Sequence, residues 1–356
     1  MKLKLFTVGP VEMFPETLKV ASQQLPYFRT EEFSKIMLEN EKMFKDSIHA
    51  PLSAKTVFLT ASGTGAMEAA VINCFTQEDR LLVINGGSFG KRFSQICDIH
   101  KIPYDEVQIP FGEELTAEML EKFDGRRYQA LLVNLHETST GQLYDINLLK
   151  DYCQKNDLYL IVDAISAYGA EQLQFEQQAI DLLITSSHKA LALSPGIAIV
   201  EVSERIYQDR VQTIPTKTMY LDFKSHIYNL ERGQTPFTPA IGTLLELHQR
   251  LESIQKQGMV NLQNEMREKA LRFRAELKKR GFSIPTYTLS NALTPILFAS
   301  GAKEMYRRLK EEYGLIVTPC GGVYADILLR VGHLGNLCWD DYEELLRAME
   351  TIGGMA

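Results

Sequence analysis

Two apolar runs in the middle of the chain each lead into an ionisable side chain. The first reads Leu158-Tyr-Leu-Ile-Val-Asp163, and the second reads Asp181-Leu-Leu-Ile-Thr-Ser-Ser-His-Lys189. Both runs have the length and the apolar composition of buried β-strands. If these strands are parallel neighbours, Asp163 and Lys189 both project into the crevice at the carboxyl edge of the sheet, where open α/β folds bind ligands.

Apolar runs alternate with helical patterns through the first two thirds of the chain, which predicts βαβ units and an α/β fold with a mostly parallel central sheet flanked by helices. The strands are expected at Thr56–Leu59, Arg80–Ile84, Gln129–Leu135, Leu158–Val162, Leu182–Thr185 and Ile197–Val202. The helices are expected at Gly65–Phe75, Lys91–His100, Ala117–Phe123 and Ile146–Asn156.

The pattern changes after Pro239, where a long helical stretch runs to Arg280 with an interruption at Gly258. We place a domain boundary there. The expected organisation is a segment 1–14 that lines the active site, a large domain 15–257, and a smaller C-terminal α+β domain 258–356.

Composition narrows the class of protein. The chain has 356 residues, 45% hydrophobic and 23% charged. Its net charge of −7 argues against a nucleic-acid partner, because proteins that bind nucleic acids usually carry a basic stripe. No apolar run approaches the roughly 18 residues that span a bilayer, and the start lacks the apolar region of a signal peptide. The five cysteines lie far apart without a CxxC motif, so neither disulfides nor a zinc site is expected. We therefore expect a cytoplasmic protein without membrane or nucleic-acid partners.

A lysine and a carboxylate at one sheet edge are the pair that pyridoxal 5'-phosphate (PLP) chemistry requires. The lysine binds the cofactor covalently, and the carboxylate keeps the pyridine nitrogen protonated. The ordinary alternatives are a surface amine for Lys189 and a helix cap for Asp163. Neither alternative explains why such an apolar strand ends in Asp163. Apolar neighbours of Lys189 would also lower its pKa and make it a better nucleophile.

Small residues follow the first predicted strand, and a helix begins there. Ser62, Gly63 and Thr64 suit a phosphate group at the positive helix end, although a helix cap with a flexible turn fits equally well. Phe89 lies among glycines after the second strand, where it could stack on a flat ring or simply cover the core.

Three further residues are candidates for binding roles. Thr138 follows the third strand and could donate a hydrogen bond to the cofactor's phenolic oxygen. The neighbouring His136 and Glu137 could instead be a metal pair, but adjacent strand residues point to opposite faces, so no metal site is predicted. Arg330 closes the run Ile327–Arg330 and could bind a carboxylate through its two-pronged guanidinium group, or form a structural salt bridge.

These motifs together resemble the class V (fold-type I) PLP-dependent aminotransferases, in particular the alanine–glyoxylate, serine–pyruvate and 2-aminoethylphosphonate–pyruvate group. The likeness extends over nearly the whole chain. The matching segments are Val8–Pro10, Phe28–Phe33, Ser62–Thr64, His136–Gly141, Asp163–Ala164, Lys189–Leu191 with Pro195–Gly196, Thr235–Pro239 and Arg330–His333.

The resemblance implies a role for each matching residue. Lys189 and Asp163 are the catalytic pair, and Arg330 binds the substrate carboxylate in a pocket that Gly9 helps to line. The remaining cofactor contacts implied by the resemblance are Ser62, Gly63, Thr64, Phe89, Thr138, Ser187, His188, Thr235 and Thr238. Thr235 and Thr238 match a segment that reaches the cofactor of the neighbouring subunit, which implies a homodimer with shared active sites.

The implied activity is ping-pong transfer of an amino group from alanine or serine to glyoxylate or pyruvate. An alternative is 2-aminoethylphosphonate–pyruvate transamination. His188 departs from the alanine–glyoxylate type, which usually has Gln there, and is reminiscent of cysteine desulfurases. Those enzymes need a nucleophilic cysteine well upstream of the arginine, whereas Cys320 lies ten residues before Arg330. A catalytically silent PLP-binding regulator is the last alternative, and the intact Asp163–Lys189 pair argues against it.

Overall fold

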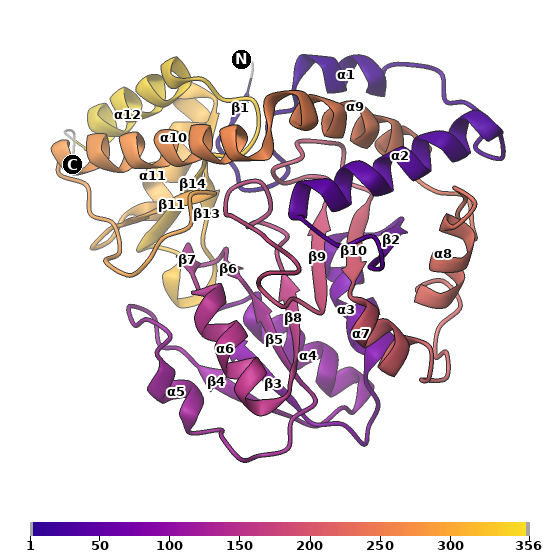
Figure 1. Ribbon diagram of the computed structural model, residues 1–356. Helices are drawn as coiled ribbons and strands as arrows, with labels where there is room; N and C mark the ends of the chain where they lie inside the picture. The colour runs from indigo at the N-terminus through magenta and orange to yellow at the C-terminus, as the bar shows by residue number, and fades with distance from the viewer. Residues whose placement is uncertain (1–2, 354–356) are drawn as a thin grey trace.

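A seven-stranded sheet forms the centre of the computed structural model, which describes residues 3–353 (Figure 1). The predicted first and last segments include residues 1–2 and 354–356, which lie outside the described residues. In spatial order the strands are β2 (Lys55–Leu59), β10 (Ala198–Val202), β9 (Leu182–Ser186), β8 (Tyr159–Asp163), β5 (Ala130–Asn134), β3 (Leu81–Asn85) and β4 (Tyr104–Gln108). Strand β10 runs antiparallel to β2 and β9, and the other pairs are parallel. The prediction of a mostly parallel sheet is confirmed.

The sheet is apolar on both faces because helices cover both. Along β8, Leu160 and Val162 belong to one hydrophobic cluster, whereas Tyr159 and Ile161 belong to the other. All five residues of this strand are buried. This two-sided burial explains why the strands appear in the sequence as unbroken apolar runs rather than as alternating ones.

The predicted helices form close to their expected positions as α3 (Gly63–Cys74), α4 (Gly90–His100), α5 (Ala117–Glu121) and α6 (Ile146–Asn156). The sequence patterns predict no helix where α2 (Glu31–Ile48) and α8 (Phe223–Leu230) form, and no strand where β4 forms. Strand β4 is the sheet edge and is only partly buried, so its sequence Tyr-Asp-Glu-Val-Gln lacks the apolar signal. The other short elements of this part are α1 (Pro15–Ala21), β6 (His136–Glu137), β7 (Gln142–Leu143), α7 (Glu204–Ile206) and the π-helix η1 (Tyr207–Val211).

The long helical stretch divides at Gly258, whose φ of +86° ends one helix and precedes the next. The two helices are α9 (Ile241–Gln257) and α10 (Met259–Lys279). A three-stranded antiparallel sheet follows, in the order β11 (Leu293–Leu297), β14 (Leu328–Gly332) and β13 (Thr318–Pro319), with α11 (Ala302–Arg308), η2 (Leu309–Tyr313), η3 (Gly322–Tyr324) and α12 (Trp339–Gly353). The domain boundary at Gly258 stays a prediction.

The N-terminal segment crosses from one part of the molecule to the other. Strand β1 (Lys4–Leu5) pairs in parallel with β12 (Leu315–Ile316), and Phe6 is buried in the C-terminal hydrophobic cluster. The N-terminal segment passes very close to Gly332. A Cβ at position 332 would come within 2.2 Å of the Thr7 carbonyl oxygen, so the crossing requires a residue without a side chain there. The residues after Phe6 are thereby led toward the carboxyl edge of the large sheet.

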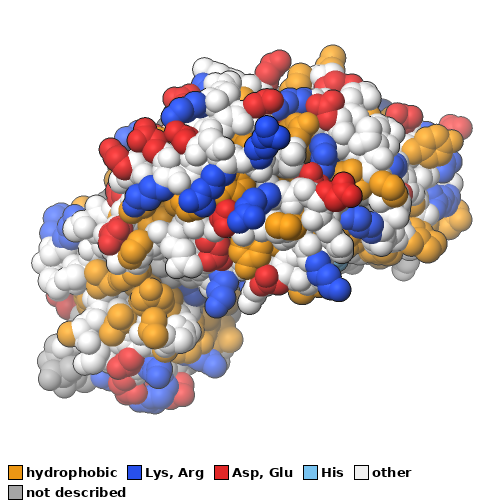
Figure 2. Space-filling view, turned by 90° about the horizontal axis from the view of Figure 1, so that it is seen from below, with side chains coloured by type: hydrophobic (Ala, Val, Ile, Leu, Met, Phe, Trp, Pro, Cys, Tyr) orange, Lys and Arg blue, Asp and Glu red, His pale blue; other side chains and the backbone are white. Residues whose placement is uncertain are grey.

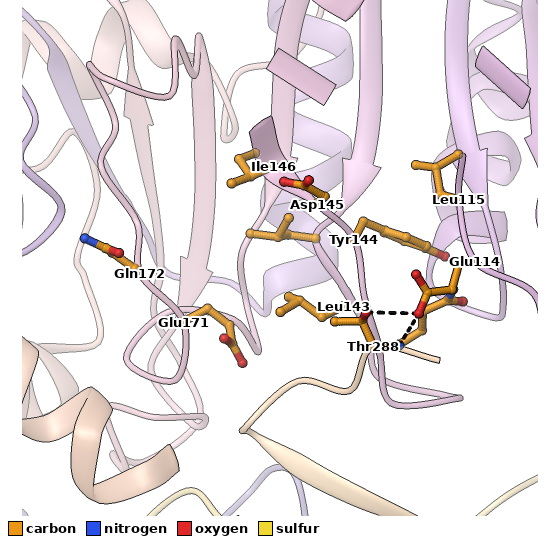
Figure 3. Close-up of a pocket in the computed structure, with 11 residues that line it drawn as sticks. Glu114, Leu115, Leu143, Tyr144, Asp145, Ile146, Glu171, Gln172 and Thr288 are labelled. Carbon is orange, nitrogen blue, oxygen red and sulfur yellow. Dashed lines mark hydrogen bonds between the residues drawn. The ribbon is translucent and has the colours of Figure 1, made fainter. Parts of the chain in front are cut away.

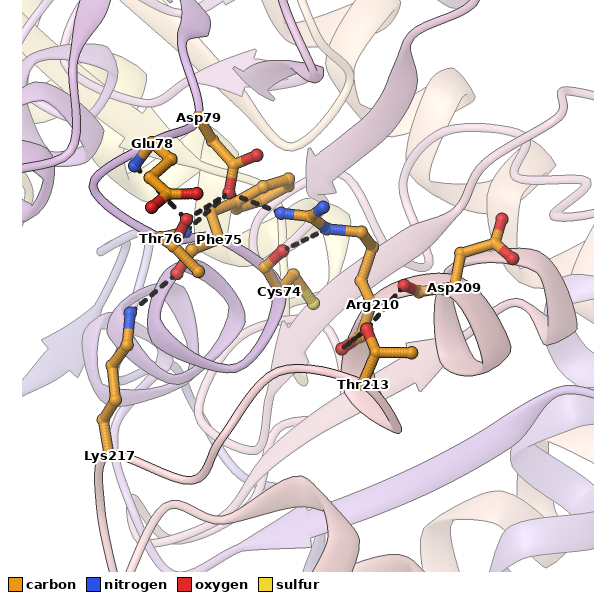
Figure 4. A network of polar contacts seen from close by, with 9 residues as sticks. All are labelled: Cys74, Phe75, Thr76, Glu78, Asp79, Asp209, Arg210, Thr213 and Lys217. Carbon is orange, nitrogen blue, oxygen red and sulfur yellow. Dashed lines mark hydrogen bonds and ion pairs between the residues drawn. The ribbon is translucent and has the colours of Figure 1, made fainter.

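A polar network fixes the far end of α3 (Figure 4). Arg210 of η1 donates from Nε to the Cys74 carbonyl oxygen at 2.9 Å and forms an ion pair with Asp79. The Asp79 carboxylate also accepts from the Thr76 backbone N–H at 2.7 Å. Because this network holds the C-terminal end of α3, the N-terminal end of the same helix is held at the sheet edge that carries Asp163.

Acidic and basic side chains are interspersed on the face shown in Figure 2. Among the described residues, no helix is long and apolar enough to cross a membrane.

Candidate active site

The predicted pair meets at the carboxyl edge of the large sheet. Asp163 is the last residue of β8, as expected, and it lies opposite Ile184 of β9. Lys189 does not end its strand: β9 stops at Ser186, and the lysine lies in the turn beyond. That turn is closed by hydrogen bonds from Ala192 N to the Lys189 carbonyl oxygen at 2.9 Å and from Leu193 N to Ser187 O at 3.0 Å. The turn directs the lysine back over the edge of the sheet.

Both ionisable groups have pKa values shifted toward neutrality. Burial lowers the pKa of Lys189 to about 8; the carboxylate of Asp163 opposes this, and the charges of Arg330 and Arg92 add to it. Burial raises the pKa of Asp163 to about 7, against a hydrogen bond from the Ile165 backbone N–H at 2.8 Å and the charge of Lys189. Among the described residues no salt bridge within 4.0 Å joins the two, so each charge is near the other without being directly paired.

Gly9 lies directly against the lysine. A Cβ at this position would come within 2.6 Å of Lys189 Cδ and 2.9 Å of Cε, and its φ of +147° is one that other residues rarely adopt. Glycine is therefore required for this close approach. The structure thus places Gly9 of the N-terminal segment against the Lys189 side chain, and its role in a substrate pocket stays a prediction.

The segment Ser62–Thr64 forms the N-terminus of α3. Ser62 is the cap residue, but its side chain makes no capping hydrogen bond. The backbone of Gly63 packs against Ile165, so closely that a Cβ at position 63 would lie 2.3 Å from Ile165 Cδ1. The free hydroxyl and the helix N-terminus thus lie beside the strand end that carries Asp163, an arrangement suited to a phosphate group.

Arg92 is a residue of this region that the sequence analysis missed. It donates from Nη1 to Thr64 Oγ1 at 2.9 Å, and its guanidinium group lies 4.8 Å from the centre of the Phe89 ring. Its charge affects the pKa of both Lys189 and Asp163. The spacing of three residues between Phe89 and Arg92 at a helix start is the one signal that could have found it.

Thr138 and Arg330 are in direct contact. Arg330 donates from Nη1 to the Thr138 carbonyl oxygen and from Nη2 to the Pro319 carbonyl oxygen, both at 2.8 Å. Its Nε is buried, and in the described part of the chain no hydrogen bond to this atom is found. The prediction that Arg330 closes a strand is wrong: it lies in the middle of β14, opposite Thr318 and Pro295, because the strand continues through Val331 and Gly332.

The hydroxyl of Thr138 forms a 2.8 Å hydrogen bond with Ser166. His136, considered above only as a metal ligand, is fully buried beside them, and neither ring nitrogen is within good hydrogen-bond geometry of another group among the described residues, although the Ser166 backbone is close enough to affect its pKa. Burial, together with the charge of Lys189, lowers the pKa of His136 to about 3. The imidazole is therefore neutral, and it brings unused hydrogen-bonding capacity to the site.

The remaining residues predicted to contact the cofactor differ in their burial and in whether their side chains already form hydrogen bonds within the chain. Ser187 donates to the Ser194 carbonyl oxygen at 2.8 Å and so helps to close the lysine turn. His188 is half-buried, and burial lowers its pKa to about 4. Thr235 is buried and donates to the Phe237 carbonyl oxygen at 2.7 Å, whereas Thr238 is exposed. The roles of these four residues stay predictions.

The residues at this edge fit PLP. A buried carboxylate without an ion-pair partner suits a protonated ring nitrogen, and a buried amine of lowered pKa suits covalent attachment. A helix N-terminus with the nearby cation Arg92 suits a phosphate. The unpartnered nitrogens of His136 and Nε of Arg330 are polar atoms that a ligand would satisfy.

A separate cavity of about 360 Å³ lies beside this site (Figure 3). Its wall includes Tyr144, Asp145, Glu171 and Thr288, and Glu114 accepts hydrogen bonds there from the backbone and hydroxyl of Thr288. None of the predicted site residues lines it. The cavity lies at the junction with the C-terminal part, and neither Asp163 nor Lys189 lines it.

The lowered pKa of Lys189 gives a testable pH dependence. In the cofactor-free protein, the neutral and reactive form of its amine should become the major form as the pH rises through about 8. Competitive labelling with an amine reagent, followed by mass spectrometry of the Lys189 peptide, measures this midpoint. Because Asp163 raises the pKa of Lys189, Asp163→Asn should move the midpoint to lower pH. A midpoint at the usual lysine value near 10.5 would contradict the buried position of the amine.

Comparison with known proteins assigns the family. A profile described as Aminotransferase class-V matches residues 20–321. A curated relative from Synechococcus sp., named soluble hydrogenase, small subunit, is 27% identical over 99% of this chain and 93% of its own length. The L-aspartate–glyoxylate aminotransferase of Paracoccus denitrificans is 25% identical over 94% of this chain and 86% of its own length.

The fold is that of solved aminotransferases. The crystal structure of alanine–glyoxylate aminotransferase from Nostoc sp. superposes with a TM-score of 0.92 and 24% identity, covering 99% of this chain and 95% of that one. The profile match, the shared fold and the buried lysine–carboxylate pair lead to one conclusion: the chain belongs to the class V aminotransferases, PLP-dependent enzymes of fold type I.

Proposed function

We propose that this aminotransferase moves an amino group from a small neutral amino acid, alanine or serine, to a small 2-oxo acid, glyoxylate or pyruvate, by a ping-pong mechanism. The observation that carries the proposal is Arg330, which is anchored by two backbone carbonyl groups and retains a buried, unpartnered Nε. A guanidinium group held in this way is a fixed receptor for one carboxylate.

PLP, when bound, carries the amino group between the two substrates and withdraws electrons from the carbon that loses its proton. In our proposal Lys189 would hold the cofactor covalently. Its amine, when free, would act as the general base that takes the proton from the donor's α-carbon and as the general acid that delivers a proton in the second half of the reaction. A pKa of about 8 suits both directions near neutral pH.

Asp163 has the role of charge partner in this scheme. Its carboxylate is buried, and burial raises its pKa to about 7, so a cationic ring nitrogen beside it would stabilise the ionised form. Ser62, Gly63 and Thr64 are proposed to hold the phosphate with the helix N-terminus, and Phe89 to stack on the ring. We add Arg92 to this group because it contacts both Thr64 and Phe89.

The family alone does not decide the amino donor. The Paracoccus relative is named for aspartate, so a dicarboxylic donor is the first alternative, and 2-aminoethylphosphonate is the second. A second arginine placed for a side-chain carboxylate was not recognised in the sequence, which favours a neutral donor. A desulfurase is disfavoured because burial raises the pKa of Cys320, which leaves its thiol protonated and a poor nucleophile.

We further propose a cytoplasmic homodimer in which Thr235 and Thr238 reach the cofactor phosphate of the neighbouring subunit. Support comes from Arg29, which donates from Nη1 to the Thr235 carbonyl oxygen at 2.7 Å and so presents this segment from the side of α2. Thr238 is exposed in the single chain, as a residue that serves a partner would be. The division into segments 1–14, 15–257 and 258–356 is part of the same proposal.

Replacing Lys189 tests the covalent attachment. Lys189→Ala should abolish turnover, and borohydride reduction should no longer attach the cofactor to the peptide that contains this position. Lys91→Ala, at an exposed lysine at the start of α4, is the control and should retain both properties. The proposal fails if wild-type protein is colourless, or if borohydride labels a different lysine.

Asp163→Asn tests the charge partner. The neutral amide no longer favours a protonated ring nitrogen, so cofactor should remain bound while proton abstraction slows by about three orders of magnitude or more. Single-turnover absorbance changes with an α-deuterated donor measure this step directly. Near-normal rates in this variant would show that another residue faces the ring nitrogen.

Arg330→Ala tests the substrate class. Losing the partner of a buried carboxylate costs on the order of 2–5 kcal/mol, so kcat/KM for the 2-oxo acid should fall about a hundredfold or more. Half-reaction rates with alanine, serine, aspartate, glutamate and 2-aminoethylphosphonate then rank the donors under identical conditions. Fastest conversion by aspartate or glutamate would refute the neutral-donor assignment and leave the roles of Lys189 and Asp163 unaffected.

A further inference from the structure

Glu137 is fully buried at the centre of the site, and the scheme above gives it no role. Its Oε1 accepts hydrogen bonds from Ser139 N at 3.1 Å, from Phe89 N at 3.4 Å and from the Ser139 hydroxyl. Its Oε2 accepts from Gly90 N and from Asn134 Nδ2, both at 3.0 Å. One side chain thus connects the turn after β3 with the turn after β5.

Five donors converge on two oxygens, and no salt bridge to Glu137 is found in the described part of the chain. Two of the donors belong to the N-terminus of α4, whose dipole favours a negative charge. An acceptor-only group, the ionised carboxylate, satisfies this set, whereas an amide would turn its own N–H toward another N–H.

Gly87 allows the two turns to meet on the carboxylate. A Cβ at this position would lie 2.3 Å from Ser139 Oγ and 2.6 Å from Glu137 Cδ. The hydroxyl of Ser139 completes the contact by accepting from Ser88 N at 3.2 Å. Residues 86–90 are therefore packed directly on residues 137–139.

The groups that Glu137 connects are those assigned to the cofactor and the substrate. Phe89 lies in the first turn, and Thr138 lies between Glu137 and Ser139 in the second. The Thr138 carbonyl oxygen in turn accepts the 2.8 Å hydrogen bond from Arg330. A shift of the Glu137 carboxylate would consequently move the proposed stacking ring and the proposed carboxylate receptor together.

We propose that Glu137 is a positioning residue, whose buried negative charge sets the placement of the ring-stacking Phe89 relative to Thr138 and Arg330. The inference rests on the proposed function, because it uses the roles given there to these three residues. It assigns to Glu137 a function other than metal binding.

The test compares Glu137→Gln with Glu106→Gln. Glu106 is a matched control, because its carboxylate accepts from Asn85 Nδ2 at 3.0 Å and from the Ser94 hydroxyl in the same region, but it contacts neither turn backbone. Three quantities are measured: the dissociation constant of PLP, the visible circular dichroism per bound cofactor at saturation, and the KM for the 2-oxo acid.

In Glu137→Gln the PLP dissociation constant and the KM should each rise at least tenfold, and the dichroism per bound cofactor should change at least twofold. In Glu106→Gln all three quantities should stay within twofold of wild type. A purely structural role would lower the melting temperature of the cofactor-free protein and leave the dichroism per bound cofactor unchanged, and that result would overturn the inference.

Ser139→Ala keeps the inference testable if Glu137→Gln does not fold. It removes one of the five donors and the acceptor for Ser88 N, so the PLP dissociation constant should rise about threefold; a wild-type value would overturn the inference. Failure of the proposed function is distinct, because wild-type protein would then take up no cofactor at Lys189. If wild-type protein is labelled there and Glu137→Gln matches it in all three quantities, this inference alone is wrong.

Discussion

The burial of two opposite charges, Asp163 and Lys189, at the edge of an otherwise apolar sheet is the constraint on which the site depends. Removing either charge from water costs several kcal/mol unless it is paired, and here each is close to the other without forming a direct salt bridge. Two hydrophobic clusters, one on each face of the sheet, supply the stability that tolerates this arrangement. A ligand that offers a cationic nitrogen to Asp163 and a covalent bond to Lys189, as proposed for the cofactor, would relieve this cost, so its binding would also stabilise the folded chain.

Three separate parts of the chain enclose this pair, and specific contacts join them. Gly9 brings the N-terminal segment against the lysine, Glu137 joins the turns after β3 and β5, and Arg330 joins the C-terminal sheet to Thr138. Because β1 pairs with β12, the N-terminal segment is anchored in the same part that carries Arg330. A movement of the C-terminal part would therefore move both Gly9 and Arg330 relative to Lys189.

The features that could be predicted from the sequence are those whose pattern lies within one short segment of the chain. Strands β5, β8 and β9 are buried on both faces, so their apolar runs are unmistakable, and an Asp at the end of such a run is itself informative. Strand β4 was missed because an edge strand need not be apolar. Arg92 and the hydrogen bonds of Glu137 were missed because they depend on turns far apart in the chain. The role proposed for Thr238 would depend on a partner subunit, and a local pattern in one chain does not describe such a contact.

In the proposed function, the α-carboxylate that all amino acids share and the side chain of the donor would be recognised by different parts of this structure. Arg330 is held by the carbonyl oxygens of Thr138 and Pro319, so the proposed receptor for the common carboxylate is fixed by backbone groups. The segment that follows β13 is more exposed than Arg330: Val323 is 84% exposed, although the neighbouring Tyr324 packs on Phe111 with ring centres 4.8 Å apart. Exposed loops supported by a rigid framework are where specificity diverges most readily. The similarity of this chain to proteins named for alanine or for aspartate agrees with the proposed division, in which the scaffold would determine the reaction and the loops would select the donor.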